Sequence, residues 1–260
     1  MKISACIICR NEQDKITLAL DSVAWCDDVV VLDSGSTDNT LTLARNHPCR
    51  PRVEHQDWRG YGPQREYAAS LCRHDWVLML DADEECSPAL RTEITALDEA
   101  QLASVALFEM PRRNYIARRY LICWSPDYQS RLMHRQRVTT DAVSIPERRV
   151  AKPGYRSLKL HGPLEHNRLT PYHQRDVVDA IKLHDYAIEL AQTMQRNGKK
   201  ARWTDLLLRP PFTFVKYYIL RGGFLYGRLG LVVAWKTTVS VILKYSVLYG
   251  TELDSDTRIK

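Results

Sequence analysis

The clearest chemical pattern of the sequence is an apolar run that ends in two aspartates, WVLMLDADEE, in which Asp81 and Asp83 follow residues 76–80. In open α/β sheets, ligands bind outside the carboxyl ends of the strands, so a strand here delivers both carboxylates to a binding site. Carboxylates hold Mg²⁺ together with the phosphate oxygens of a ligand. The pattern therefore favours a metal-assisted phosphate site over a solvated turn.

A second acidic strand end lies earlier in the chain, at Asp33 in VVVLDSGSTDNT. Gly35 permits a turn there, and the helix predicted after it presents backbone N–H groups to phosphate or sugar oxygens. Asn11 and Glu12 end the first apolar run in the same way. We expect these strand ends to converge on one polar site.

The elements that must position these residues follow from hydrophobic periodicity. Residues 1–110 alternate short apolar runs with helical patterns, which is typical of βαβ units and a mostly parallel sheet. From 111 to about 169 the pattern is irregular and rich in Arg, Tyr and Pro, which predicts long connections at the mouth of a site. An amphipathic helix is predicted over 176–195, ended by Asn197 and Gly198.

The segment 203–250 alternates apolar stretches with single basic residues. Arg221, Arg228, Lys236 and Lys244 interrupt it, so we expect no run of the roughly 18 uncharged residues that a membrane span needs. Helices that lie in a membrane interface fit this pattern, and helices packed on the rest of the protein are the alternative.

Composition sets further limits. The 260 residues carry a formal net charge of +6, and Asp205 is the only acid between residues 195 and 250. Seven cysteines without a regular spacing indicate no disulfide framework, and Cys6 and Cys9 fit buried strand residues better than a metal or redox pair. The N-terminus lacks the pattern of a signal peptide, so secretion is not expected.

The motifs CIICRNE, VVVLDSGSTDNT, GYGPQREYA and WVLMLDADEE, in this order, resemble the inverting family 2 glycosyltransferases of GT-A fold. More narrowly, PRRNYIARRY, SPDYQSRL, HGPLEH and LRGGFLYGRLG are similar to lipopolysaccharide inner-core β-1,4-glucosyltransferases of Gram-negative bacteria. The resemblance covers nearly the whole chain. It implies an α/β fold with a Rossmann-like, mostly parallel sheet, helices on both faces, and amphipathic C-terminal helices.

The resemblance also implies a domain division and a reaction. Residues 1–200 would form the catalytic domain, with a nucleotide-binding half over about 1–110 and an acceptor half over about 111–200, and 201–260 a basic membrane-associating segment. The expected reaction is an inverting transfer of a sugar, with glucose favoured, from a UDP-sugar to a heptose of the lipopolysaccharide core or lipid A-core. The expected location is the cytoplasmic face of the bacterial inner membrane.

Roles for single residues follow from the same resemblance. The nucleotide-sugar would contact five residues, which are Asn11, Glu12, Asp33, Arg65 and Asp81. Asp83, with Asp81, would bind Mg²⁺ or Mn²⁺, which neutralises charge on the leaving UDP.

Two carboxylates are candidates for the general base that an inverting transfer needs. Glu147 in SIPERR occupies the family's place for a catalytic Glu, although Pro146 replaces the preceding His of the family. Asp127 in SPDYQSRL is the second candidate. Each of them could instead be a surface acid paired with an arginine.

Arg112, Arg113 and His166 are expected to contact the acceptor or a phosphate, and Lys182 and Tyr186 match a family spacing on one helix face. A purely structural role for His166, and a helix that only covers the site, would also explain these residues. No recognisable nucleic-acid module accompanies the arginines, so a nucleic-acid partner is not expected.

Competing functions remain open at this point. A haloacid-dehalogenase phosphatase shares an apolar strand before DxD, but Glu85 stands where that pattern has Thr or Val. A nucleotidyltransferase would need a glycine-rich first loop, and CRNEQDK has no glycine. A transferase that acts on polyprenyl phosphate and a non-catalytic membrane-surface binding protein also compete, and the sequence does not separate UDP-glucose from related donors.

Overall fold

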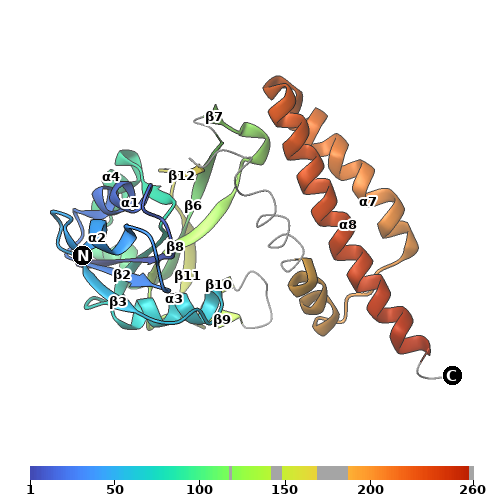
Figure 1. The fold of residues 1–260 in the computed structure, drawn as a ribbon. Coiled ribbons are helices and arrows are strands. Elements are labelled where there is room, and N and C mark those ends of the chain that lie inside the picture. Colours follow the sequence, from blue (N-terminus) through green and yellow to red (C-terminus); the bar gives the residue numbers. More distant parts are fainter. Residues whose placement is uncertain (117–118, 142–147, 169–186, 258–260) are drawn as a thin grey trace. The chain divides into compact units, whose positions relative to one another are not determined.

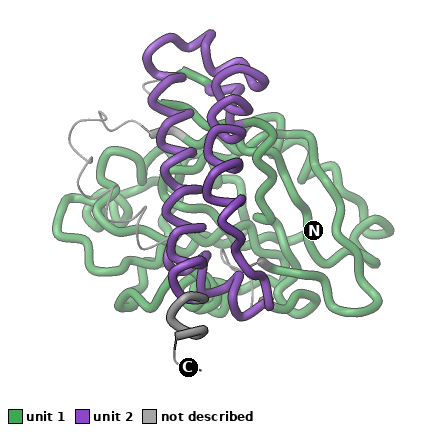
Figure 2. Tube along the Cα trace, turned by 90° about the vertical axis from the view of Figure 1, so that its right-hand side faces the viewer, with its two compact units in different colours: residues 1–120, 125–141, 147–169 green, residues 121–124, 142–146, 170–260 purple. Residues whose placement is uncertain are grey.

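The computed structural model describes residues 1–116, 119–141, 148–168 and 187–257 (Figure 1). The chain forms two compact units (Figure 2). Unit 1 comprises Met1–Tyr120, Ser125–Asp141 and Glu147–Leu169, and unit 2 comprises Leu121–Trp124, Ala142–Pro146 and Thr170–Lys260.

The N-terminal half of unit 1 is a parallel sheet. Its central strand β1 (Ile3–Cys9) lies between β2 (Asp28–Asp33) and β4 (Trp76–Asp81), and β3 (Arg52–His55) pairs with the far side of β2. Cys9 pairs with Asp33 and Ile8 pairs with Asp81. The carboxyl ends of these three strands therefore meet at one sheet edge, as the sequence predicts.

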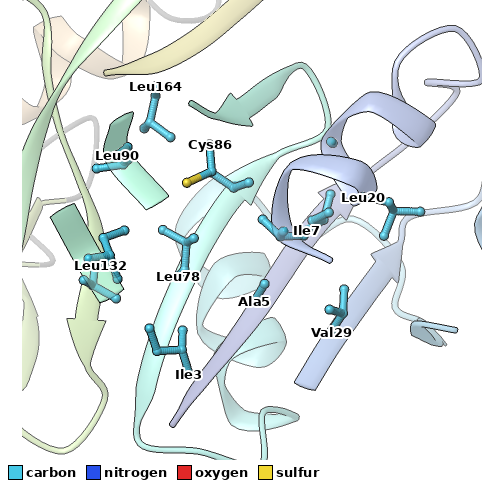
Figure 3. Close-up of a cluster of buried hydrophobic side chains, with 14 of the residues drawn as sticks. Ile3, Ala5, Ile7, Leu20, Val29, Leu78, Cys86, Leu90, Leu132 and Leu164 are labelled. Carbon is cyan, nitrogen blue, oxygen red and sulfur yellow. The ribbon is translucent and has the colours of Figure 1, made fainter. Parts of the chain in front are cut away.

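Helices cover both faces of this sheet. The face with Ile3, Ala5 and Ile7 packs against α1 (Ile16–Val23), α2 (Thr40–Arg45) and α4 (Pro88–Thr95), and Figure 3 shows part of this core. The opposite face, with Cys6 and Ile8, packs against α3 (Tyr61–Ser70). Because both faces are covered, every residue of β1 is buried, which is the reason its sequence is a continuous apolar run. The predicted α/β fold with helices on both faces is confirmed.

The second half of unit 1 mixes strand directions. β8 (Tyr128–His134) runs antiparallel between β4 and β6 (Val105–Ile116), β12 (Leu164–Arg168) pairs with β6, and β5 (Glu84–Cys86) pairs with β12. Among the described residues the order is β3-β2-β1-β4-β8-β6-β12-β5. The parallel sheet predicted for residues 1–110 thus continues into a mixed one.

Smaller elements complete unit 1. The short helix α5 (Glu99–Ala103) precedes β6. The strands β7 (Arg119–Tyr120) and β11 (Arg156–Lys159) pair with β6, whereas β9 (Val138–Asp141) and β10 (Arg148–Ala151) form a separate two-stranded ribbon.

The expectation of long connections over 111–169 is wrong for much of this range, because β8, β11, β12 and the end of β6 lie within it. The cause is visible in the pairing of its charged side chains. Arg131 of β8 is buried against carboxylates rather than solvated. Because a charged residue occupies a buried position, the sequence of β8 does not show the alternation of apolar and polar residues that is typical of a strand.

The cysteines of unit 1 include the CxxC pair of β1. Cys6 and Cys9 are both buried strand residues, and all seven cysteines of the chain are free thiols. Burial, together with the neighbouring Asp33 carboxylate, raises the pKa of the Cys9 thiol. The interpretation of Cys6 and Cys9 as buried strand residues is confirmed.

Unit 2 is helical. Residues 187–196 form a helix that ends in a turn at Asn197 and Gly198, where the sequence predicts its end. After α7 (Trp203–Val215), a π-helical turn η3 (Lys216–Leu220) and a 3-10 turn η4 (Gly223–Tyr226) lead into α8 (Arg228–Thr257). Another 3-10 turn, η1 (Ile122–Trp124), belongs to the same unit.

The helices α7 and α8 pack side by side, as Figure 2 shows in purple. Within the described residues, one helical segment, Arg228–Thr251, is long and apolar enough to cross a membrane when length and composition alone are considered. The segment contains no run of about 18 uncharged residues, as expected, because Lys236 and Lys244 lie eight residues apart within it. It is apolar enough on average despite these two charges.

Candidate active site

The turn after β2 is built around the carboxylate of Asp33. This side chain is buried, and its Oδ2 accepts hydrogen bonds from the backbone N–H groups of Gly35 at 2.9 Å and Ser36 at 3.0 Å. Gly35 has φ of 86°, a conformation that glycine adopts without strain. Asp33 therefore shapes the turn that ends the strand.

Side chains from the loop after β1 tie it to this turn. The side-chain oxygen of Asn11 accepts a hydrogen bond from the backbone N–H of Thr37 at 2.8 Å, and the backbone N–H of Glu12 donates to the hydroxyl of Thr40 at 2.8 Å. Asn11 has φ of 55°, which Asn tolerates better than most residues. The structure thus brings together Asn11, Glu12 and Asp33, three of the predicted nucleotide-sugar residues.

Asp81 lies between two guanidinium groups at the end of β4. Arg65 of α3 contacts its two oxygens at 2.8 and 2.9 Å, and Arg131 of β8 contacts Oδ2 at 2.7 Å. Burial raises the pKa of Asp81, but Arg131 and Arg65 outweigh this effect and lower the pKa to about 2. Asp81 is therefore ionised and held in place, and Arg65 lies at the same strand end.

Glu84 is the second carboxylate that Arg131 contacts. It is fully buried, and its Oε1 accepts hydrogen bonds from Arg131 at 2.7 Å and from Arg112 at 2.9 Å. Its other oxygen accepts from the backbone N–H of Asp81 at 3.2 Å. Glu84 consequently fixes the turn between Asp81 and β5 that carries Asp83.

Arg112 links Glu84 to Asp127. Its Nε and Nη2 lie 2.9 and 2.8 Å from Oδ2 of Asp127. Gln129 donates to the other oxygen of Asp127 at 2.7 Å, and Asn114 donates to Oδ2 at 3.1 Å. Burial raises the pKa of Asp127, but Arg112 and these amides lower it below its usual range. Asp127, half-buried at 26% exposure, is an ionised carboxylate at the site.

Asn114 continues the network to His166 and Asp83. The Asn114 oxygen lies 2.7 Å from Nδ1 of His166, and Nε2 of His166 lies 3.2 Å from Oδ2 of Asp83. Asn114 and Arg112 stand two residues apart on β6, so both point to the same side of the sheet. His166 is held in register on the neighbouring strand because β12 pairs residue by residue with β6.

These contacts form one continuous polar network within unit 1. Its members, in order of contact, are Arg65, Asp81, Arg131, Glu84, Arg112, Asp127, Asn114, His166 and Asp83. Four carboxylates face three guanidinium groups, so the network carries one excess negative charge when His166 is neutral. Such a balance suits a cation that arrives with an anionic diphosphate.

The pair of Asp83 and His166 fits a divalent cation. Two neighbouring ligands of an octahedral ion at about 2.1 Å stand about 3.0 Å apart, and the observed separation between Nε2 and Oδ2 is 3.2 Å. Among the described residues no group of three or more His, Cys, Asp or Glu side chains has the geometry of a metal site. A cation here would therefore take its remaining ligands from a phosphate group and water.

The remaining predicted residues lie away from the network or outside the description. Arg113, next to Arg112 on β6, points away from the network and pairs with Glu165 at 3.4 Å, with 49% of its side chain exposed. Glu147, Lys182 and Tyr186 lie outside the described residues. Of the two candidate bases, Asp127 is the one that lies within the described residues.

Sequence reasoning missed Glu84, Arg131 and Asn114. Glu84 stands in the DADEE motif itself, and Asn114 follows Arg112 at strand spacing, so both had a local signal. Arg131 had none, because its role depends on the antiparallel pairing of β8 with β4.

Comparison with known families matches residues 4–151 to the family described as Glycosyl transferase family 2. Among curated proteins, the lipopolysaccharide core biosynthesis glycosyltransferase LpsC of Rhizobium meliloti is 26% identical, and the alignment covers 95% of this chain and 94% of the relative. An uncharacterised glycosyltransferase of Rickettsia felis is 28% identical, with 89% and 83% covered.

Among solved structures, glucosyl-3-phosphoglycerate synthase from Mycobacterium tuberculosis, in complex with Mn²⁺, UDP and phosphoglyceric acid, is similar with a TM-score of 0.49. It is 16% identical, and the superposition covers 76% of this chain and 79% of that protein. The structure of TarS residues 1–349 from S. aureus is similar with a TM-score of 0.44 at 14% identity, covering 92% of this chain and 90% of that one.

Proposed function

The chain belongs to glycosyl transferase family 2, since the family match spans more than half of its 260 residues, and we propose that it transfers glucose from a UDP-sugar to a heptose of the lipopolysaccharide core. The reaction would invert the configuration at the anomeric carbon. The observation that carries the proposal is the network from Arg65 to Asp83 at the carboxyl edge of the sheet. This network combines arginine side chains held in place with carboxylates beside the turn at Asp33.

The donor would bind along this edge. Asn11, Glu12 and Asp33 belong to the two tied loops that would hold the nucleotide, and Arg65, fixed by Asp81, offers positive charge to the diphosphate. Two guanidinium groups occupy the oxygens of Asp81, which favours a positioning role for that residue over direct metal ligation.

Asp83 and His166 would hold Mg²⁺ or Mn²⁺. A cation bound there neutralises the negative charge that develops on the leaving diphosphate. Asn114 orients the imidazole, and Glu84 fixes the backbone of the turn that carries Asp83. The protein residues thus place one carboxylate and one imidazole for the cation before the donor arrives.

Asp127 is the base that the described residues supply. In an inverting transfer the base takes the proton of the acceptor hydroxyl while that oxygen attacks the anomeric carbon. The bond from this carbon to the diphosphate breaks, and UDP leaves with the electron pair. Arg112 and Asn114 hold the ionised carboxylate toward the site, and Glu147 remains the second candidate base.

The acceptor assignment is supported by the full-length similarity to the lipopolysaccharide core biosynthesis relative. Exposed Arg113, which pairs with Glu165 on the side of β6 away from the network, offers positive charge to acceptor phosphates that reach that side. We place the protein on the cytoplasmic face of the inner membrane, with residues 1–200 as catalytic domain and 201–260 as the membrane-associating segment.

The experiment that tests this function measures UDP release from a panel of UDP-sugars with Mn²⁺ or Mg²⁺, with and without truncated core lipopolysaccharide. The expected result is acceptor-dependent release from UDP-glucose that a chelator abolishes. Release only with a polyprenyl phosphate would replace the acceptor. No release from any donor would favour a binding protein over an enzyme.

A further inference from the structure

The α7–α8 hairpin of unit 2 exposes many large apolar side chains. Of the 24 such side chains that are exposed in the described part of the chain, 14 lie between residues 203 and 242. A soluble monomer rarely leaves so many together in water, and such surfaces mark contacts with proteins or membranes.

These side chains follow the helical period. Those of α8 recur every three or four residues along one face, namely Leu231, Trp235, Val239 and Ile242. Those of α7 recur in the same way, namely Leu208, Phe212 and Val215. The inward face of α8 carries different residues, including Val233, Ala234 and Leu248, which are buried. The exposed stripes are therefore not part of the core of the hairpin.

The tip of the hairpin, residues 219–225, also exposes apolar side chains. Ile219 is 54% exposed, Leu220 69%, Phe224 52% and Leu225 70%. The backbone beneath them is tightly packed, because a Cβ on Gly230 would lie 1.7 Å from the carbonyl oxygen of Gly223. A compact turn thus presents four apolar side chains outward.

The charges around the tip are basic. Lys216 and Arg228 flank it in sequence, Arg221 lies within it, and Asp205 is the only acid between residues 195 and 250. Asp205 is already paired with Arg209 within α7. Basic residues beside apolar and aromatic ones match the headgroups and the acyl boundary of an anionic bilayer.

The geometry points to the α7–α8 hairpin as a membrane-docking element that inserts its tip into an anionic bilayer without crossing it. A spanning α8 would place Lys236 and Lys244 in the hydrocarbon, which is costly for charged side chains. The inference extends the proposed function by naming how the enzyme reaches a lipid-linked acceptor. Only the lipid-linked acceptor in this inference rests on the proposed function. The docking itself depends on the hairpin.

The test is co-sedimentation of the full-length protein with vesicles of phosphatidylcholine alone or mixed with phosphatidylglycerol, without donor or acceptor. We expect binding to the mixed vesicles that weakens as salt rises. The double variant Leu220→Ser/Leu225→Ser should lower the partition coefficient by on the order of tenfold or more, because two exposed leucines no longer enter the lipid. A wash at alkaline pH should release the wild-type protein.

The matched control is Leu18→Ser/Leu43→Ser, which changes two exposed leucines of unit 1 and should leave vesicle binding unchanged. Circular dichroism checks that both double variants remain folded. Equal binding of the tip variant and the wild type overturns the proposal, as does retention after the alkaline wash.

Self-association is another outcome that overturns it. If light scattering without lipid shows dimers that only the tip variant loses, the hairpin binds a second copy of the chain instead. UDP release in detergent measures the proposed function separately. If the wild-type protein releases UDP but does not bind vesicles, the result contradicts membrane docking by the hairpin and does not contradict the proposed function.

Discussion

Asn114 and His166 are joined by a hydrogen bond of 2.7 Å between the amide oxygen and Nδ1 of the imidazole. The amide group of Asn114 also lies 3.1 Å from Asp127. An ionised carboxylate only accepts hydrogen bonds, so the Asn114 nitrogen faces Asp127 and its oxygen faces His166. That oxygen requires a proton on Nδ1, so Nε2, which lies 3.2 Å from Oδ2 of Asp83, is the ring nitrogen that would bind a cation in the proposed site.

Replacing Asn114 with Leu should therefore weaken Mn²⁺ binding by about 10- to 100-fold, because the imidazole loses the partner that fixes its tautomer and orientation. Isothermal titration calorimetry with Mn²⁺ and UDP measures this without turnover. Gln129→Leu is the matched control, since Gln129 contacts Asp127 but not His166. Equal losses in both variants would assign the effect to Asp127 instead.

Asp83→Ala should lower UDP-glucose turnover at least about 100-fold, because the charge on the leaving diphosphate is no longer compensated. The side chain is 25% exposed and its loss opens no core cavity, so the thermal midpoint should stay within about 4 °C of the wild type. Glu99→Ala removes an exposed carboxylate of α5 and serves as the control for both measurements. Undiminished turnover of Asp83→Ala would contradict the metal assignment.

Glu84→Gln should lower the free energy of unfolding by about 3 kcal/mol, because it leaves buried Arg131 and half-buried Arg112 without their shared carboxylate. Urea denaturation measures the change. Arg113→Met breaks the more exposed pair with Glu165 and should cost less than about 1 kcal/mol. Similar values for the two variants would show that the buried pairs contribute no more than exposed ones.

Asp81 should make the fold sensitive to acid. Its pKa in the folded protein is about 2, below the value of an unfolded Asp, so its stabilisation is present above about pH 4 and is lost as the pH falls toward 2. Asp81→Asn should remove on the order of 2 kcal/mol of the change in the free energy of unfolding over this pH range. Urea midpoints between about pH 2 and pH 6 test this, and parallel curves for variant and wild type would contradict it.

Much of the candidate site could be predicted because strand ends are local features. Asp33 and Asp81 follow continuous apolar runs, and parallel pairing through β1 brings them to one edge. Arg131 depends on the antiparallel pairing of β8 with β4, which no local pattern encodes. Its polar side chain is typical of a solvated loop until the carboxylates that it pairs with are placed beside it.

The C-terminal helices show a different limit. The sequence predicts helices after residue 201 and their basic, aromatic character, and α7 and α8 confirm the helices. The sequence does not reveal which apolar residues pack inward. Val233 and Trp235 are both apolar, yet the first is buried and the second is 53% exposed although its ring packs against Phe214 of α7.

Asp127 provides the sharpest test of the mechanism. As the base, it must be ionised and must face the acceptor, and Arg112 and Asn114 satisfy both needs by keeping its pKa low and its orientation fixed. Asp127→Asn preserves the shape but removes proton acceptance, so turnover should fall by about 10²- to 10⁴-fold while UDP affinity changes little. Calorimetry with UDP separates the two effects.

The pH profile gives an independent check. Because the pKa of Asp127 lies below its usual range, wild-type turnover should hold as the pH falls through about 5 and decline only in stronger acid. Glu147→Gln is the comparison variant, since Glu147 is the second candidate base. If Glu147→Gln abolishes turnover while Asp127→Asn retains it, the proton passes to Glu147, and the network through Arg112 serves to position the acceptor rather than to activate it.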